Sequence, residues 1–381
     1  MKLVVLVPVF NAGLQVDNYM PRIAGLEERE EVQAIAALAS VLERKKFISS
    51  PHVNEDFEYI LLDNMDIGAQ ARIRMNDKKL IVRAGPYLLE HIRECDGFML
   101  DIQDPRCEEY LRYIDTLGRP GTMKMAVNVE TRAQLNDCLA RGFSLFVGTF
   151  YMKHAVTQKR LSELKPVVHS KIRLMAEIGS WGNELDNYNI SAICDIIQSD
   201  VFLSLNVLKL ANNATYHGSE KINSIREGIM RIGATQMRSW AMSVLATSVS
   251  EDSMGEMSRM TLIKAKFMEL MAKILNVNAF EAFYTGILSM AGLILGTEQE
   301  MAIREFNVSA SMRMYLRYED DMGRLLQCAD DYLHMRVLEC EKMLADKRKL
   351  YDEMYRLYIE AVLWVGNILK NIEGGDTKEI G

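Results

Sequence analysis

The stretch TMKMAVNVETRAQLNDCLARGFSLFVG, residues 122 to 148, carries the clearest fold signal in this chain. It has an apolar run at each end, and the segment between the two runs has helical spacing. Thr131, with Gln134 three residues later, forms a capping box, which predicts that a helix begins there. Gly142 ends that helix before the second run. We therefore expect a strand, a helix and a second strand over residues 123–148.

The same alternation extends towards the N-terminus. Further strand-like runs precede this unit: LVVLVPVF, FEYILLD, KKLIVRAG and GFMLDI. Amphipathic segments lie between most of them, such as EEVQAIAALASVLERKK and CEEYLRYIDTLG. Alternation of strands and helices favours a parallel sheet or barrel. We predict an α/β domain with six strands over residues 1–160.

Beyond residue 163 the apolar residues follow helical spacing. Three stripes are Leu203, Val207, Leu210 and Ala214; Ile225, Ile229 and Ile232; and Met260, Ile263, Phe267, Leu270 and Ile274. Ser224 and Glu227 can open the second of these helices as a capping box. We expect an all-α domain over residues 163–381, with the boundary near Pro166.

Composition limits the classes of function. The 381 residues are 49% hydrophobic and 25% charged, which suits two domains with substantial cores. The net charge of -7 combines 45 basic with 52 acidic residues and does not favour nucleic acid as a partner. The apolar run at the N-terminus is too short to span a bilayer, and no other stretch of the sequence approaches the length of a transmembrane helix. We expect a cytoplasmic protein with no membrane partner.

The six cysteines lie far apart in the sequence: Cys95, Cys107, Cys138, Cys194, Cys328 and Cys340. They form no C-x-x-C pair, and no cysteine and histidine spacing would hold zinc. We interpret them as reduced core residues, and we expect neither a metal nor another cofactor.

The run AVNVETRAQLNDCLARGFSLFVGTFYMKH, residues 126 to 154, resembles the C-terminal part of EAL domains, the cyclic-di-GMP phosphodiesterases. There the corresponding run reads A-E-G-V-E-T-x-x-Q-L, followed by a helix and a strand that ends in Q-G-Y/F. The resemblance implies a modified (β/α)8 barrel whose strand-end carboxylates hold two divalent metals that activate water. With six strand-like runs, we expect a truncated or incomplete (β/α) EAL-like barrel here.

Most positions that the resemblance assigns to chemistry have changed. Neutral or apolar residues stand at five of them: Met20, Asn64, Met99, Val127 and Val147. Four residues keep the family's letter: Asp63, Asp101, Glu130 and Gly148. The surviving acids are expected to stabilise turns and a helix start, because scattered single carboxylates cannot build a two-metal site. We expect the backbone to require Gly148, and we expect Val147 to be buried at its strand end.

The segment SDVFLSLNVLKLANNATYHGSEKINSIREGIMRIGATQMRSWAMSVLATS, residues 199 to 248, resembles the HDOD domain, a helical relative of HD-type metal phosphohydrolases. Asp200 is expected to open a helix there. In AFYTGILSMAGLILG, Ser289 and Met290 stand where HD hydrolases place the His-Asp pair. The order of the two domains resembles bacterial signalling proteins described as EAL and modified HD-GYP proteins.

These observations favour a non-catalytic bacterial signalling scaffold whose partners are other signalling proteins. A non-hydrolysing receptor for cyclic-di-GMP or a related nucleotide is the alternative, and a residual phosphodiesterase using Asp63, Asp101 and Glu130 ranks third. Homo-oligomerisation is left open. We expect protein partners to bind the HDOD-like surface within residues 205–245, where five candidates are Asn212, Asn213, Tyr216, His217 and Arg226.

Overall fold

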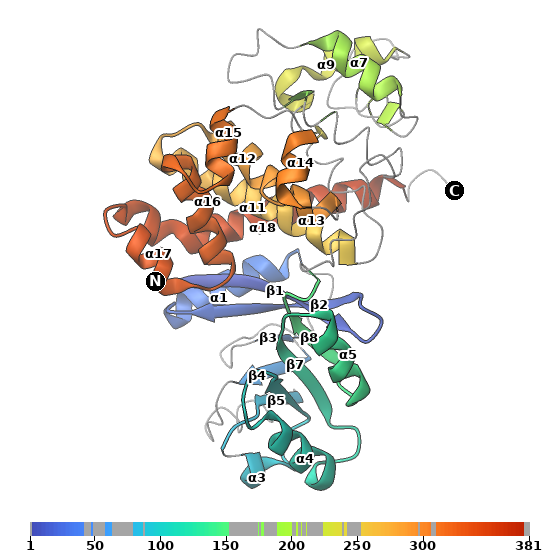
Figure 1. Ribbon diagram of the computed structural model, residues 1–381, viewed down its shortest axis with the longest axis vertical. Helices are drawn as coiled ribbons and strands as arrows, with labels where there is room; N and C mark the ends of the chain where they lie inside the picture. The colour runs from blue at the N-terminus through green and yellow to red at the C-terminus, as the bar shows by residue number, and fades with distance from the viewer. Residues whose placement is uncertain are drawn as a thin grey trace. The chain divides into compact units, whose positions relative to one another are not determined.

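The structure is a computed structural model (Figure 1). It describes residues 2–41, 47–48, 58–62, 79–86, 88–151, 189–199, 224–237, 253–295, 298–305 and 310–376, with a few further residues between 174 and 241. The chain divides into two compact units. The first combines residues 1–154, 251–256 and 331–366, and the second combines residues 155–250, 257–330 and 367–381. The proposed domain ranges 1–160 and 163–381 stay a prediction.

The first unit is built on a mixed sheet, whose strands are β1 (Leu3–Asn11), β2 (Val16–Ala24), β3 (Phe47–Ile48), β4 (Tyr59–Leu62), β5 (Lys79–Arg83), β6 (Gly97–Asp101), β7 (Met123–Val129) and β8 (Leu145–Gly148). Their order across the sheet is β2-β1-β8-β7-β6-β5-β4-β3. Strands β3 to β8 run parallel, whereas β1 is antiparallel to both β2 and β8. The sheet forms a curved half-barrel, and its terminal strands β2 and β3 approach each other without pairing among the described residues.

The described sheet has eight strands, so the prediction of six was wrong. The missed strand β2 reads VDNYMPRIA, and its polar residues and Pro21 hide the pattern of a strand. It forms because β1 provides a long apolar partner, with Leu6 directly opposite Pro21. The other missed strand, β3, is only two residues long.

The β-α-β unit over residues 123–148 is confirmed. Between β7 and β8 lies α5 (Arg132–Ala140), and Thr131 and Gln134 form the expected capping box at its start. Gly142 has a positive φ of 76°, as expected where the chain leaves the helix. Further helices of this unit are α1 (Glu28–Ala39), α3 (Leu88–His91) and α4 (Cys107–Leu117).

The first unit also contains the end of α16 (Asp320–Leu333), all of α17 (Val337–Met343) and most of α18 (Arg348–Asp376). Tyr332 at the end of α16 and Tyr358 on α18 reach the backbone of β1. The Tyr332 hydroxyl accepts a hydrogen bond from the Val4 N–H at 3.1 Å and donates one to the Val4 carbonyl at 3.2 Å. The Tyr358 hydroxyl accepts from the Leu6 N–H at 3.0 Å.

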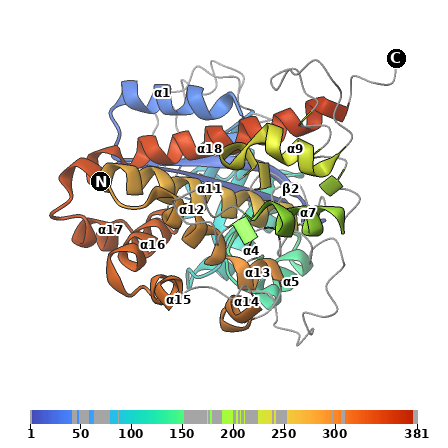
Figure 2. The same cartoon turned by 90° about the horizontal axis from the view of Figure 1, so that it is seen from above.

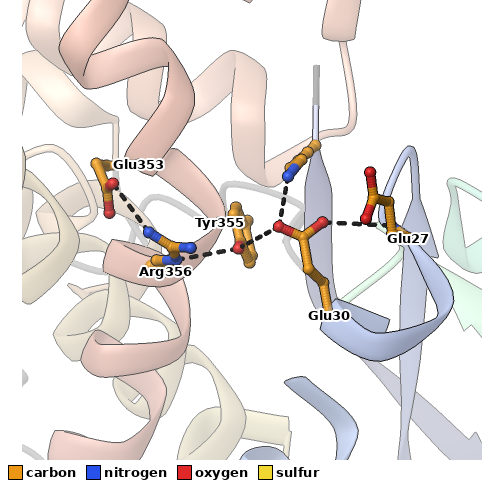
Figure 3. Close-up of polar contacts among 6 residues, drawn as sticks. Glu27, Glu30, Glu353, Tyr355 and Arg356 are labelled. Carbon is orange, nitrogen blue, oxygen red and sulfur yellow. Dashed lines mark hydrogen bonds and ion pairs between the residues drawn. The ribbon is translucent and has the colours of Figure 1, made fainter. Parts of the chain in front are cut away.

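Helices α1 and α18 run side by side (Figure 2). The Tyr355 hydroxyl on α18 donates to Glu30 near the start of α1 at 3.3 Å, and a Cβ added at Gly366 would lie 2.7 Å from Val41 just beyond α1. The same number of residues separates the two contact points on each segment, so the helices are parallel. Figure 3 shows Tyr355 linking Glu30 to Arg356, whose Nε donates to the tyrosine oxygen at 3.0 Å.

The second unit is helical in its described residues. Its helices are α7 (Ile190–Gln198), α9 (Ile225–Ile232), most of α11 (Ser253–Leu275), α12 (Ala279–Leu288), α13 (Ala291–Leu295), α14 (Gln299–Glu305), α15 (Ala310–Leu316) and the first part of α16. None of the helices in the described part of the chain is long and apolar enough to cross a membrane.

The predicted helical stripes are confirmed where the structure describes them. Leu203, Val207, Ile229 and Ile232 are buried in one core with α7, and Ile225 packs against that core. Leu210, Ala214 and the predicted helix start at Asp200 lie outside the described residues. Ser224 precedes α9, but its side chain makes no capping bond, so the predicted capping box there was wrong.

Helix α11 contains the third stripe, in which Ile263, Phe267 and Leu270 are buried. Residues between the stripe positions are buried as well, including Ala265 and the charged Lys264. The Lys264 ammonium pairs with the Asp330 carboxylate at 2.6 Å, which compensates its loss of hydration. Helix α11 is therefore covered on more sides than an amphipathic stripe predicts.

Candidate functional site

Four of the positions singled out in the sequence meet inside the half-barrel. Met20 on β2, Met99 on β6, Val127 on β7 and Val147 on β8 belong to one hydrophobic cluster, and each is at most 9% exposed. We call this group the inner cluster, and its other buried members are Val9, Tyr59, Leu61, Ile81, Met125 and Leu145. The structure thus brings together side chains that are far apart in the sequence.

The register of the sheet explains this convergence. Met99 lies opposite Met125 on β7, which in turn lies opposite Leu145 on β8. Side chains two residues apart on a strand share a face, so Val127 and Val147 point to the same side as these three partners. This alternation fills the concave face of the parallel strands with apolar groups.

Asp101 follows Met99 by two residues and lies at the carboxyl end of β6, at the rim of the inner cluster. One carboxylate oxygen accepts a hydrogen bond from the Asn128 amide at 2.7 Å, and the other accepts from the Gln103 N–H at 2.9 Å. The Arg83 guanidinium at the end of β5 lies 3.7 Å from the same carboxylate. Asp101 therefore stabilises the turn after its strand, as the sequence predicts.

Asn128 is placed by an irregularity in β7. The pairing of β7 with β8 shifts register between Ala126 and Val129, and Asn128 has a positive φ of 61°. Asparagine tolerates this conformation better than most residues. The bulge turns the Asn128 side chain to the rim while Val127 stays in the inner cluster. Sequence reasoning missed the rim contribution of Asn128 and Arg83, and only the strand-end position of Arg83 hinted at it.

Gly148 is required by backbone packing at the end of β8. A Cβ at this position would lie 1.9 Å from the carbonyl oxygen of Val129, which no ordinary contact permits. The Phe150 N–H also bonds that carbonyl at 3.1 Å, so the close approach is part of the loop geometry. Both expectations for this strand end are confirmed, since Val147 is buried and Gly148 has a structural reason to be glycine.

Glu130 stands at the start of α5. It is exposed, and its N–H donates to the Gln134 side-chain oxygen at 2.9 Å. The Thr131 N–H donates to the same oxygen at 3.0 Å, while the Gln134 N–H donates to the Thr131 hydroxyl at 3.2 Å. The local geometry around Glu130 is that of a capped helix start. Asp63 and Asn64 lie outside the described residues.

The resemblance to HD hydrolases predicts the place of their His-Asp pair at two positions of the helical unit, Ser289 and Met290. The Ser289 hydroxyl donates to the Gly286 carbonyl at 2.7 Å, and Met290 is buried in the helical core. Of the proposed interaction surface, Arg226 lies exposed on α9, 3.3 Å from the Ser191 hydroxyl. The other members, Asn212, Asn213, Tyr216 and His217, lie outside the described residues.

All six cysteines are unbridged, and five of them are buried, as the sequence predicts. Burial raises the pKa of the Cys138 thiol to about 11, which keeps it protonated at neutral pH. Within the described ranges, no group of three or more His, Cys, Asp or Glu residues is arranged to hold a metal ion.

Comparison with known proteins identifies part of the chain. Residues 181–313 match the HDOD domain. The chain is 26% identical to the uncharacterized protein YuxH of Bacillus subtilis over 67% of its own length and 62% of that protein. It is 24% identical to the cyclic di-GMP phosphodiesterase CdgJ of Vibrio cholerae over 53% of its length and 46% of that protein. The chain thus spans only about half to three-fifths of these relatives.

Two solved structures from Shewanella amazonensis are also similar. A candidate phosphohydrolase shares 16% identity and a TM-score of 0.35, covering 57% of this chain and 99% of that one. A candidate metal-dependent phosphohydrolase shares 18% identity and a TM-score of 0.25, covering 55% of this chain and 95% of that one.

Proposed function

We propose that this protein is a non-catalytic bacterial signalling scaffold that acts through protein–protein contacts. The match of residues 181–313 to the HDOD domain supports a role in signalling. The observation that carries the non-catalytic part is the inner cluster. Met20, Met99, Val127 and Val147 pack together at positions where the resemblance to EAL domains places metal-binding or phosphate-binding groups.

The chemistry of a two-metal phosphodiesterase explains why these side chains matter. Divalent cations such as Mg²⁺ need several oxygen ligands at fixed separation, and thioether or aliphatic side chains offer none. A carboxylate placed among the inner cluster would lose its hydration without a compensating partner. Asp101, an acid at the rim, accepts hydrogen bonds from Asn128 and Gln103. The inner cluster therefore supports retention of the sheet for structure rather than for hydrolysis.

In this proposal the protein acts in the cytoplasm, and its partners are other signalling proteins or a second copy of the chain. Arg226 on α9 is exposed and belongs to the described part of the proposed HDOD-like interaction surface. Partner capture followed by crosslinking and mass spectrometry tests this surface. An Arg226→Glu variant is expected to lose a partner that the wild type enriches, whereas Arg112→Glu on α4 serves as a matched control. Equal capture by both variants would remove the α9 surface from the proposal.

A second candidate function is a nucleotide receptor or a residual cyclic-di-GMP phosphodiesterase. Its support is the similarity to CdgJ, which is named as a cyclic di-GMP phosphodiesterase. A residual enzyme would use Asp63, Asp101 and Glu130, and a receptor would need cationic contacts to phosphate. Calorimetry with cyclic-di-GMP, with and without Mn²⁺, separates the receptor from the scaffold. Saturable micromolar binding would contradict a pure scaffold.

A further inference from the structure

The α14–α15 region of the helical unit carries a small pocket rich in arginine. Its volume is about 190 Å³, and its lining residues are Glu300, Ile303, Arg304, Arg313, Leu316 and Arg317. All of them belong to the second compact unit, and they lie away from α9 in the sequence.

Three arginines and one glutamate line this pocket, and two of the arginines pair with that glutamate. Glu300 lies 3.1 Å from Arg317 and 3.8 Å from Arg304. Arg313 also lines the pocket, and among the described residues no ion pair or hydrogen bond of its side chain occurs. The lining thus carries an excess positive charge on a protein whose net charge is negative. Guanidinium groups recognise carboxylates through paired hydrogen bonds, so a further carboxylate suits this site.

Apolar groups accompany these charges. Ile303 and Leu316 contribute aliphatic surface to the pocket lining. Nearby along the same two helices, Met301 is 41% exposed and Met314 is 44% exposed. Exposed methionine adapts to differently shaped apolar side chains, and methionine and arginine are both enriched in protein interfaces. The surface therefore offers both a charged and an apolar contact.

The size of the pocket selects the class of ligand. Sites that enclose a small molecule typically measure about 300 to 1,000 Å³, which is larger than this pocket. The α14–α15 pocket can accept the terminal groups of one or two side chains, while the rest of a ligand lies on the protein surface. A protein segment that presents acidic and apolar side chains together meets these requirements better than a dinucleotide does.

We propose that the α14–α15 surface, defined by Met301, Arg304, Arg313, Met314 and Arg317, binds an acidic amphipathic segment of a partner protein. The inference rests on the proposed scaffold function and names the chemistry of the partner. Carboxylates of the segment pair with Arg313 and Arg317, and its apolar side chains contact the two methionines. Glu300 holds the neighbouring guanidinium groups in place.

The test uses the whole chain and a synthetic amphipathic helix that carries glutamates on one face and leucines on the other. A second peptide with glutamine in place of every glutamate is the matched probe. Fluorescence anisotropy is expected to show binding of the glutamate peptide that weakens about tenfold in Arg313→Glu and falls with added salt. Arg324→Glu on α16 reverses the charge of an exposed arginine outside the pocket. The affinity of this control variant for the glutamate peptide should match that of the wild type.

Three outcomes would overturn the proposal: equal binding of the two peptides, unchanged affinity in both Arg313→Glu and Arg317→Glu, or full competition by inorganic phosphate at equal concentration. Self-association that Arg313→Glu abolishes would assign the surface to a second copy and would also overturn it. Circular dichroism of each variant confirms that loss of binding is not loss of folding. If the peptide test fails but the protein neither binds nor cleaves cyclic-di-GMP, the proposal for the α14–α15 surface is wrong and the scaffold proposal still stands.

Discussion

The buried Tyr332 hydroxyl satisfies both backbone groups of Val4, accepting from its N–H at 3.1 Å and donating to its carbonyl at 3.2 Å. Strand β1 pairs with β8 only at Phe10 and Asn11, so the first half of β1 needs other hydrogen-bond partners along this edge. An unpaired buried backbone group is costly, and a bare strand edge also invites pairing with another chain. The C-terminal helices therefore complete the sheet of the first unit.

Replacing Tyr332 with phenylalanine is predicted to lower the free energy of unfolding by roughly 1–3 kcal/mol, because both Val4 groups lose their partner without access to water. Tyr113→Phe is the control, since the Tyr113 hydroxyl on α4 bonds only the nearby Glu109 side chain among the contacts described. Urea unfolding of both variants measures the difference. A Tyr332→Phe protein as stable as the control would contradict this role.

Stability is predicted to fall as the pH rises above about 10. Burial raises the pKa of Tyr332 well above its usual range and the pKa of Tyr284 to about 12. Between the unfolded and folded pKa values the unfolded chain releases protons that the folded protein retains, so ionisation favours unfolding. The stabilisation contributed by these protonated tyrosines is fully present below the unfolded-state pKa. It is lost as the pH rises through the folded-state pKa. Thermal unfolding between about pH 9 and about pH 12, a range that contains the ordinary tyrosine pKa and that of folded Tyr284, measures it. Tyr284→Phe should weaken the decline.

Met99→Lys is predicted to destabilise the first unit severely, by several kcal/mol, because an ammonium would be buried in the inner cluster without a partner. The resemblance to EAL domains predicts a lysine at this position, so the substitution tests whether the inner cluster accepts one. Met99→Leu keeps the volume and should cost less than about 1.5 kcal/mol. Chemical unfolding compares the two. A Met99→Lys protein with near wild-type stability would show that polar space remains at this position.

Gly148→Ala is predicted to destabilise the end of β8, since the added Cβ would overlap the Val129 carbonyl and force the backbone apart. A loss of roughly 1–3 kcal/mol is expected. Gly85→Ala is the matched control, because its nearest contact would be an ordinary 4.0 Å. Differential scanning calorimetry of the two variants tests the prediction, and equal melting temperatures would refute it.

Local signals were sufficient for much of the fold. The helix α5 is framed by Thr131, Gln134 and Gly142, and each acts through neighbouring residues that the sequence displays. Strand β2 was missed because its pairing with β1 outweighs the local effect of Pro21. Ser224 has the right sequence spacing for a capping box, yet spacing alone does not place its hydroxyl.

Contacts between segments far apart in the sequence could not be predicted from local patterns. Helical periodicity shows that α18 has an apolar face, but not that Tyr358 on it reaches Leu6 of β1. For the candidate site, the resemblance singled out Met20, Met99, Val127 and Val147 as changed positions. That they pack in a single cluster follows from sheet register and strand order, which depend on pairings between distant segments.

The most direct test of the central claim is the hydrolysis of cyclic-di-GMP by the purified chain in the presence of Mg²⁺ or Mn²⁺. The scaffold proposal predicts no product above the buffer background, and the same result for Asp101→Ala. Turnover above background that disappears in Asp101→Ala, while the variant keeps its folded circular dichroism spectrum, would contradict the proposal and assign Asp101 to a working catalytic site.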